Sequence, residues 1–144
     1  MKFPVCAALS AALVLAACSP TSSAPAEKPV MRILSPAADA RLPAGKVKID
    51  VDVRGYTLVA ANALVKTGEG HLHFFIDVPA SSVPAGQAVP LDQPKTYVHA
   101  GKAPYTSREI ELTPGEHTIT VVMADAAHVV VAEPESVSLT VLVE

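Results

Sequence analysis

The chain has 144 residues, of which 50% are hydrophobic and 17% are charged, and its formal net charge is −3 at neutral pH. This length fits one domain and is too short for two of ordinary size. Thirteen prolines and seven glycines argue against a coiled coil, and the absence of tryptophan argues against a base-stacking surface. Because no basic patch is available to neutralise phosphates, the composition excludes nucleic acid as a partner.

The N-terminus has the features of a secretory signal. Lys2 supplies a positive charge, residues 3–17 form an almost unbroken apolar run, and the run ends on small residues. A helix needs about 20 apolar residues to span a bilayer, so this run is too short for a stable transmembrane anchor. We therefore predict a signal peptide over residues 1–17 that is cleaved from the mature protein.

The end of this run, Leu15-Ala16-Ala17-Cys18, resembles the lipobox of bacterial lipoproteins. The resemblance implies that Cys18 is acylated with fatty acids such as palmitate and becomes the first residue of a lipoprotein anchored to the membrane. Ser19 stands where an aspartate would favour the inner membrane, which implies the outer membrane, with the domain facing the periplasm. An ordinary signal peptide with a chance cysteine is the alternative.

The cysteines and the segment after them delimit the folded part. Cys6 leaves with the signal and Cys18 is used by the lipid, so the mature domain has no disulfide and no cysteine metal site. Residues 18–29 comprise the lipidated cysteine and a stretch rich in Ser, Pro and Ala without an apolar period, which predicts a disordered tether. We expect the folded domain over residues 30–144.

From residue 30 onward, apolar residues alternate with polar ones, which is the period of a β-strand. Residues 71–78 show this with Leu72, Phe74 and Ile76 on the predicted core face, and His71 and His73 on the other. Further strands are expected at residues 30–34, 46–54, 97–99, 108–112, 117–123 and 137–143. About seven short strands separated by Pro- and Gly-containing turns predict an all-β fold, an antiparallel immunoglobulin-like β-sandwich, with a closed barrel as the alternative.

Four segments of this region together resemble a family of exported bacterial domains known as DUF4399, for domain of unknown function. They are GEGHLHFFID at residues 68–77, HAGK at 99–102, LTPGEHTI at 112–119 and ADAAH at 124–128. The four segments occur in the same order as in the family, and the resemblance covers about residues 30–144. It implies an exported, immunoglobulin-like and non-catalytic domain.

The histidines of these segments are the candidate ligands of a metal. His71 and His73 leave the same face of one strand, about 7 Å apart at their Cα atoms. If this strand and the strand near His117 are the neighbouring C and F strands of the sandwich, His128 and Asp125 approach His71 from the following loop. Nitrogen donors of this kind, with one carboxylate, suit Cu(II) or Zn(II). The alternative is that the histidines are surface groups or hydrogen-bond a backbone carbonyl.

Two other histidines receive different interpretations. His117 follows a Pro-Gly turn at the start of a strand, where immunoglobulin-like domains often place a tyrosine that ties the corner to the backbone, so we expect a structural role. His99 lies outside any geometry that the sequence defines and is a second-tier metal candidate. Met123 alternates with Ile119 and Val121, which predicts a core residue and not a copper ligand.

Three functions remain open from the sequence. The first is a lipid-anchored binding module of the cell envelope, non-catalytic, that takes Cu or Zn. The second is a structural or protein-interaction domain of the envelope, with an unknown envelope protein as partner and no metal. The third, more remote, is a redox enzyme similar to superoxide dismutase, which would need a disulfide and further ligands that the mature chain lacks. No hydrolase elbow, zinc-protease motif or phosphate loop is present.

Overall fold

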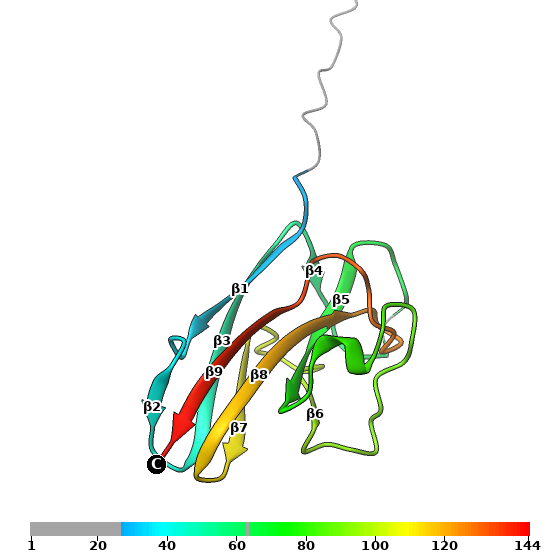
Figure 1. The fold of residues 1–144 in the computed structure, drawn as a ribbon. Coiled ribbons are helices and arrows are strands. Elements are labelled where there is room, and N and C mark those ends of the chain that lie inside the picture. Colours follow the sequence, from blue (N-terminus) through cyan, green and yellow to red (C-terminus); the bar gives the residue numbers. More distant parts are fainter. Residues whose placement is uncertain (1–26, 63) are drawn as a thin grey trace, which may run out of the picture.

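A computed structural model describes residues 27–62 and 64–144 of the chain (Figure 1). The predicted signal peptide over residues 1–17, the lipidation site Cys18 and most of the tether lie outside these described residues. Within them the regular structure is almost entirely β-strand, with one short 3-10 helix, η1 (Ala80–Ser82). No helix in this part of the chain has the length and apolar character needed to cross a membrane.

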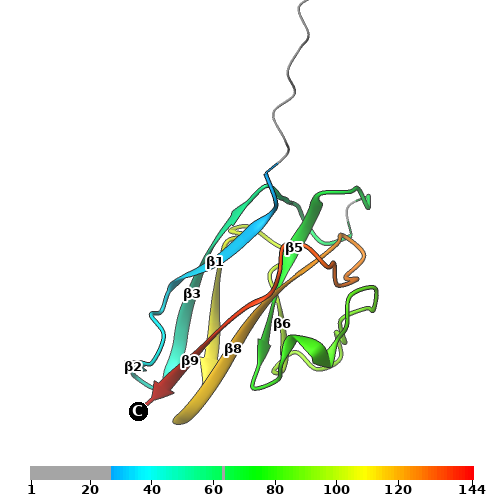
Figure 2. The same ribbon diagram turned by 45° about the horizontal axis from the view of Figure 1, so that its top comes forward.

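The strands form two sheets, which Figures 1 and 2 show from two directions. The smaller sheet has three antiparallel strands in the order β1 (Val30–Ser35), β3 (Gly45–Arg54), β7 (Ser107–Leu112). The larger sheet has six strands, in the order β2 (Ala40–Leu42), β9 (Val137–Val143), β8 (Gly115–Ala124), β5 (Glu69–Ile76), β4 (Thr57–Leu58), with β6 (Tyr97–His99) also paired to β5.

This arrangement is the predicted immunoglobulin-like sandwich. The first strand is divided between the sheets: β1 pairs with β3 in one, and β2 runs parallel to β9 in the other. β5 and β8 are antiparallel neighbours, as expected for the C and F strands, with His71 opposite Ala124. The two separate sheets rule out the closed barrel. The sequence predicted about seven strands, and the two additional ones, β2 and β4, are only two or three residues long and too short to show alternation.

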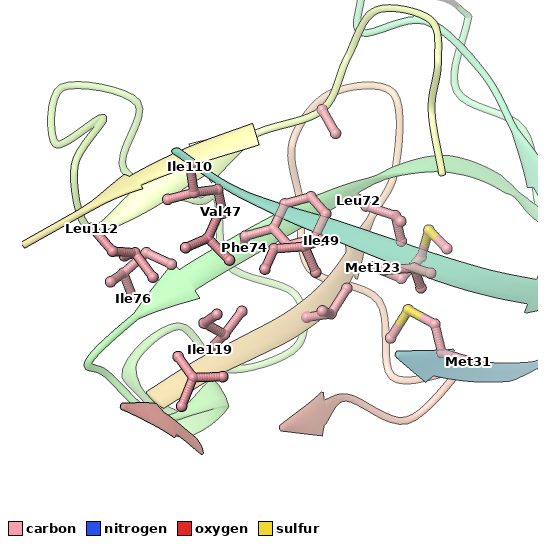
Figure 3. Packing of buried hydrophobic residues seen from close by; sticks show 14 of the residues in the cluster. Met31, Val47, Ile49, Leu72, Phe74, Ile76, Ile110, Leu112, Ile119 and Met123 are labelled. Atoms are coloured by element: carbon pink, nitrogen blue, oxygen red, sulfur yellow. The ribbon is translucent and has the colours of Figure 1, made fainter. Parts of the chain in front are cut away.

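The main core lies between the two sheets and is formed by the predicted apolar faces. Alternate residues of β5 and β8 meet alternate residues of β3 and β7 there, as Figure 3 shows. Met123 is 1% exposed within this core, which confirms its assignment as a packing residue. The largest contributors include Ile49, Leu72, Phe74 and Ile119.

The opposite face of β5 is buried as well. Every residue from Gly70 to Ile76 is inaccessible to solvent or nearly so, because two long loops cover the outer face of the larger sheet. The loop after β5 and the loop after β8 are joined by backbone hydrogen bonds, such as Gly86 N to Val130 O at 2.8 Å and Val89 N to His128 O at 2.9 Å. They enclose a second apolar cluster around Phe75, and the histidines of β5 lie beneath the same cover.

Candidate metal centre

The site begins at the N-terminal half of β5. His71 and His73 are two residues apart and therefore point to the same side of the sheet, away from the main core. Both are completely buried, because the covering loops close over this face. β6 pairs antiparallel to β5 with His99 directly opposite His73, so a third imidazole joins the same face from the neighbouring strand.

The fourth imidazole comes from the turn after β8. Asp125 orders this turn, since its Oδ1 accepts hydrogen bonds from the backbone N–H groups of Ala127 at 2.8 Å and Val129 at 3.0 Å. The backbone N–H of His128 also donates to the carbonyl of Asp125, and His128 has a left-handed φ of 67°. This turn directs His128 back over β5, where it is 8% exposed.

The four imidazoles converge on one point. One ring nitrogen from each of His71, His73, His99 and His128 lies within 4.8 Å of those of the other three. His71 Nε2 and His73 Nε2 are 3.1 Å apart, and the ring centroid of His71 lies 4.8 Å from that of His99 and 4.9 Å from that of His128. In a tetrahedral site with metal–nitrogen bonds of about 2.0–2.1 Å, neighbouring nitrogens are about 3.3 Å apart. The observed spacing therefore needs side-chain shifts of only about 1 Å for all four nitrogens to reach bonding distance of one ion.

These histidines lack the partners that ordinarily justify burying an imidazole. Within the described chain, the only hydrogen-bond partner of the side chain of either His71 or His73 is the side chain of the other histidine. The Nδ1 atoms of both residues and Nε2 of His99 are buried without any partner. If one Nε2 accepts from the other, the accepting ring must carry its proton on Nδ1, so at least one buried N–H is unpaired. Each such group costs about 1–3 kcal/mol, which is difficult to explain by a purely structural role.

The environment disfavours the charged form of three of the four imidazoles. Burial, followed by the repulsion of neighbouring histidines, lowers the pKa of His71 to about 4 and that of His73 to about 2, although the Asp125 carboxylate opposes the shift at His71. Burial and the nearby His128 also lower the pKa of His99. At neutral pH these rings are therefore in the form that coordinates a metal, and protons compete only weakly.

Gly101 creates the space for one of the four rings. A Cβ atom at this position would collide with the Nε2 and Cε1 atoms of His99 and would lie 2.6 Å from the Cβ of Ala61. The backbone of Gly101 is not in the left-handed region, so the absence of a side chain is required by the close approach of His99 and not by the conformation.

The structure brings together three of the four predicted ligands and adds one. His71, His73 and His128 meet as the strand pairing implied, and the second-tier candidate His99 joins them. The carboxylate of Asp125 lies outside this group, and its Oδ1 accepts hydrogen bonds from two backbone N–H groups of its own turn. Asp125 therefore acts as a positioning residue for His128.

The features that the sequence did not identify are the place of His99 and the spacing role of Gly101. The one available signal was that both stand in a single short motif, His99-Ala100-Gly101. The motif does not show which strand pairs with residues 97–99, so it could not place His99 opposite His73.

His117 lies apart from the cluster, and its ring contacts both sides of the corner for which a structural role was predicted. Its Nε2 is 2.9 Å from the carbonyl of Thr113 and its Nδ1 is 2.8 Å from Asp77 Oδ2. Since both partners are acceptors, both ring nitrogens must donate, so the imidazolium fits this position. Although burial opposes it, the hydrogen bonds and the charge of Asp77 raise the pKa of His117. Asp77 also ends β5 two residues earlier than predicted, because it adopts a left-handed φ of 59° to reach this corner.

Comparison with known proteins identifies the family and leaves the activity open. Residues 48–144 match the family described as domain of unknown function DUF4399, so the chain belongs to that family. No curated protein matches the sequence. Among solved structures, fibronectin(III)-like modules of Clostridium thermocellum CbhA superpose with a TM-score of 0.48 and 13% identity, covering 80% of this chain and 97% of that one. An engineered protein superposes with a TM-score of 0.48 and 16% identity, covering 83% of this chain and 21% of that one.

Proposed function

We propose that this member of the DUF4399 family is a non-catalytic binding module of the cell envelope that takes up one Cu(II) or Zn(II) ion. The ligands are His71, His73, His99 and His128. The observation that carries the proposal is the convergence of four imidazoles. Two of them are fully buried, and within the described chain their side chains have no hydrogen-bond partner except each other.

The donor set determines the class of metal. All four candidate ligands are imidazoles, and no carboxylate or thiolate belongs to the cluster as described. Calcium and magnesium require oxygen ligands and would not be held here. Imidazole nitrogens suit Cu(II) and Zn(II), and Cu(II) is the strongest binder among the divalent ions of the first transition row.

The structural alternative predicts a different behaviour. A hydrogen bond between His71 and His73 would account for their 3.1 Å separation without an ion. This hydrogen bond would not account for the approach of His99 and His128, whose ring centroids lie 5.1 and 5.7 Å from the ring centroid of His73. A metal explains all four positions with a single interaction.

Metal binding can be tested on the purified full-length protein. After removal of metal, calorimetric titration with Cu(II) or Zn(II) is expected to show saturable binding of about one ion per chain. His73→Ala should abolish this binding. Because His73 is buried and its removal leaves a cavity, His99→Ala provides a second variant at a less buried position, with at least about a tenfold loss of affinity expected.

The matched control is His117→Ala, which removes an imidazole of the same domain from outside the cluster. It should weaken the corner between β7 and β8 and leave the stoichiometry at one. Absence of saturable binding in the unaltered protein, or binding that survives both cluster substitutions, would leave the structural alternative as the function.

We further propose that the module is held on the outer membrane, facing the periplasm, by a lipid on Cys18. The lipobox-like sequence before Cys18 supports this anchor. More than one acyl chain gives stable attachment, since each buried methylene contributes about 0.8 kcal/mol. Mass analysis of the mature N-terminus should find an acylated Cys18, and Cys18→Ser should prevent this modification. An unacylated cysteine in the membrane-derived protein would refute the anchor.

A further inference from the structure

A solvent-connected pocket lies directly beside the histidine cluster. It has a volume of about 410 Å³, and its lining includes His99 and His128, the two cluster histidines that are not completely buried. Asn62, Tyr97 and Arg108 line it as well. The pocket therefore borders the histidine cluster on the side of His99 and His128.

The pocket has a positive electrostatic character. Arg108 is its one charged lining residue within the described chain, and no acidic side chain lines it there. Arg108 is an exposed residue of β7, and it shares the lining of the pocket with His99 and His128.

The proposed metal would make the pocket more positive. Imidazole ligands bring no negative charge, and no carboxylate of the described chain belongs to the ligand group, so both positive charges of a divalent ion would stay uncompensated. Charge interactions are stronger beside a partly apolar wall than in water. A negatively charged group is thus the partner that the metal and Arg108 would both favour.

We infer that the pocket admits a small anion that binds the metal as an additional ligand while its outer end pairs with Arg108. This inference rests on the proposed metal site and names the class of ligand it would take. Cu(II) accepts tetragonal geometries with an additional ligand, so coordination of the anion requires no histidine to leave. The guanidinium of Arg108 offers a fork of donors that matches a carboxylate or another small oxyanion.

The test uses azide as the probe on the Cu(II)-loaded full-length protein. Titration with sodium azide is expected to produce a saturable azide-to-copper charge-transfer band and to change the electron paramagnetic resonance spectrum. Arg108→Gln should weaken azide binding by about fivefold to tenfold, and Arg108→Lys should retain part of the affinity. The affinity for Cu(II) itself should change little in either variant, because Arg108 is not a ligand.

The control is Arg32→Gln, which removes the same charge from β1, in the same sheet and away from the pocket. It should leave azide binding unchanged, which separates a local contact from the overall charge. If the protein binds copper and azide does not alter either spectrum, the inference is wrong while the metal site stands. Equal effects of the two arginine substitutions would also refute it, whereas failure to bind copper at all would refute the metal site first.

Discussion

Substitution of Gly101 by alanine tests the geometry of the histidine cluster through stability alone. At a position where the backbone accepts a side chain, Gly→Ala usually stabilises a protein by about 0.4–1 kcal/mol, because it restricts the unfolded chain. The backbone of Gly101 meets that condition. The structure nevertheless predicts the opposite sign, because the added methyl group would collide with the ring of His99 and approach Ala61.

The magnitude follows from the cost of overpacking. Forcing a methyl group into a filled site costs about 1–3 kcal/mol, and for a domain of this size about 1 kcal/mol corresponds to about 4 °C in melting temperature. We therefore expect Gly101→Ala to lower the melting temperature of the metal-free protein by about 4 to 12 °C. Displacement of His99 should also weaken metal binding by about 10- to 100-fold, as for other residues that orient a ligand.

The assay is a double-mutant cycle measured by denaturant unfolding of the metal-free protein. In a His99→Ala background the ring is absent and only the contact with Ala61 remains, so Gly101→Ala should cost clearly less than in the unaltered protein. A stabilising Gly101→Ala, or an equal cost in both backgrounds, would show that His99 does not occupy the described position.

Three further predictions concern the core, the corner and the turn. Val51 is 2% exposed between the sheets, so Val51→Asp should lower the free energy of unfolding, measured with denaturant, by at least about 3 kcal/mol. Asp50→Val, on the other face of β3, should lower it by less than about 1 kcal/mol. Similar losses in the two variants would contradict the strand register. The raised pKa of His117 means that its pairing with Asp77 stabilises the fold fully below about pH 6.5 and less as the pH rises through the folded-state pKa. The stability lost in His117→Phe should therefore be larger at about pH 5.5 than at about pH 9, and a loss independent of pH would exclude the imidazolium. Asp125→Ala should leave the fold largely intact and weaken metal binding by about 10- to 100-fold in calorimetric titration, whereas unchanged affinity would remove its positioning role.

Alternation of apolar residues was sufficient to predict the fold class and most strands. The strand expected at residues 137–143 is β9 with the same bounds, and the core face of β5 is the one that the pattern indicated. This works because a strand with one face in a core has a period of two that local sequence must satisfy. Strand ends were less predictable: Asp77 ends β5 because of its contacts with β8, which no local pattern shows.

The candidate site depended on tertiary structure to a greater degree. The spacing of His71 and His73 placed them on one face, and the expected pairing of β5 with β8 brought His128 near them. The burial of these histidines was not predictable from the sequence, because it results from two loops far apart in the sequence that join over the sheet. Asp125 was a plausible ligand by position, and only the hydrogen bonds of its turn showed that its carboxylate serves the backbone.

The sequence by itself determined an all-β sandwich, a histidine pair on one strand face and a corner histidine at His117, because strand alternation and turn chemistry act between residues close along the chain. Tertiary structure alone decided that His99 belongs with the pair, since this depends on the register of β6 against β5 and on the missing side chain at Gly101. A ligand set is defined by where rings meet in space, and pairing between distant segments determines that meeting point.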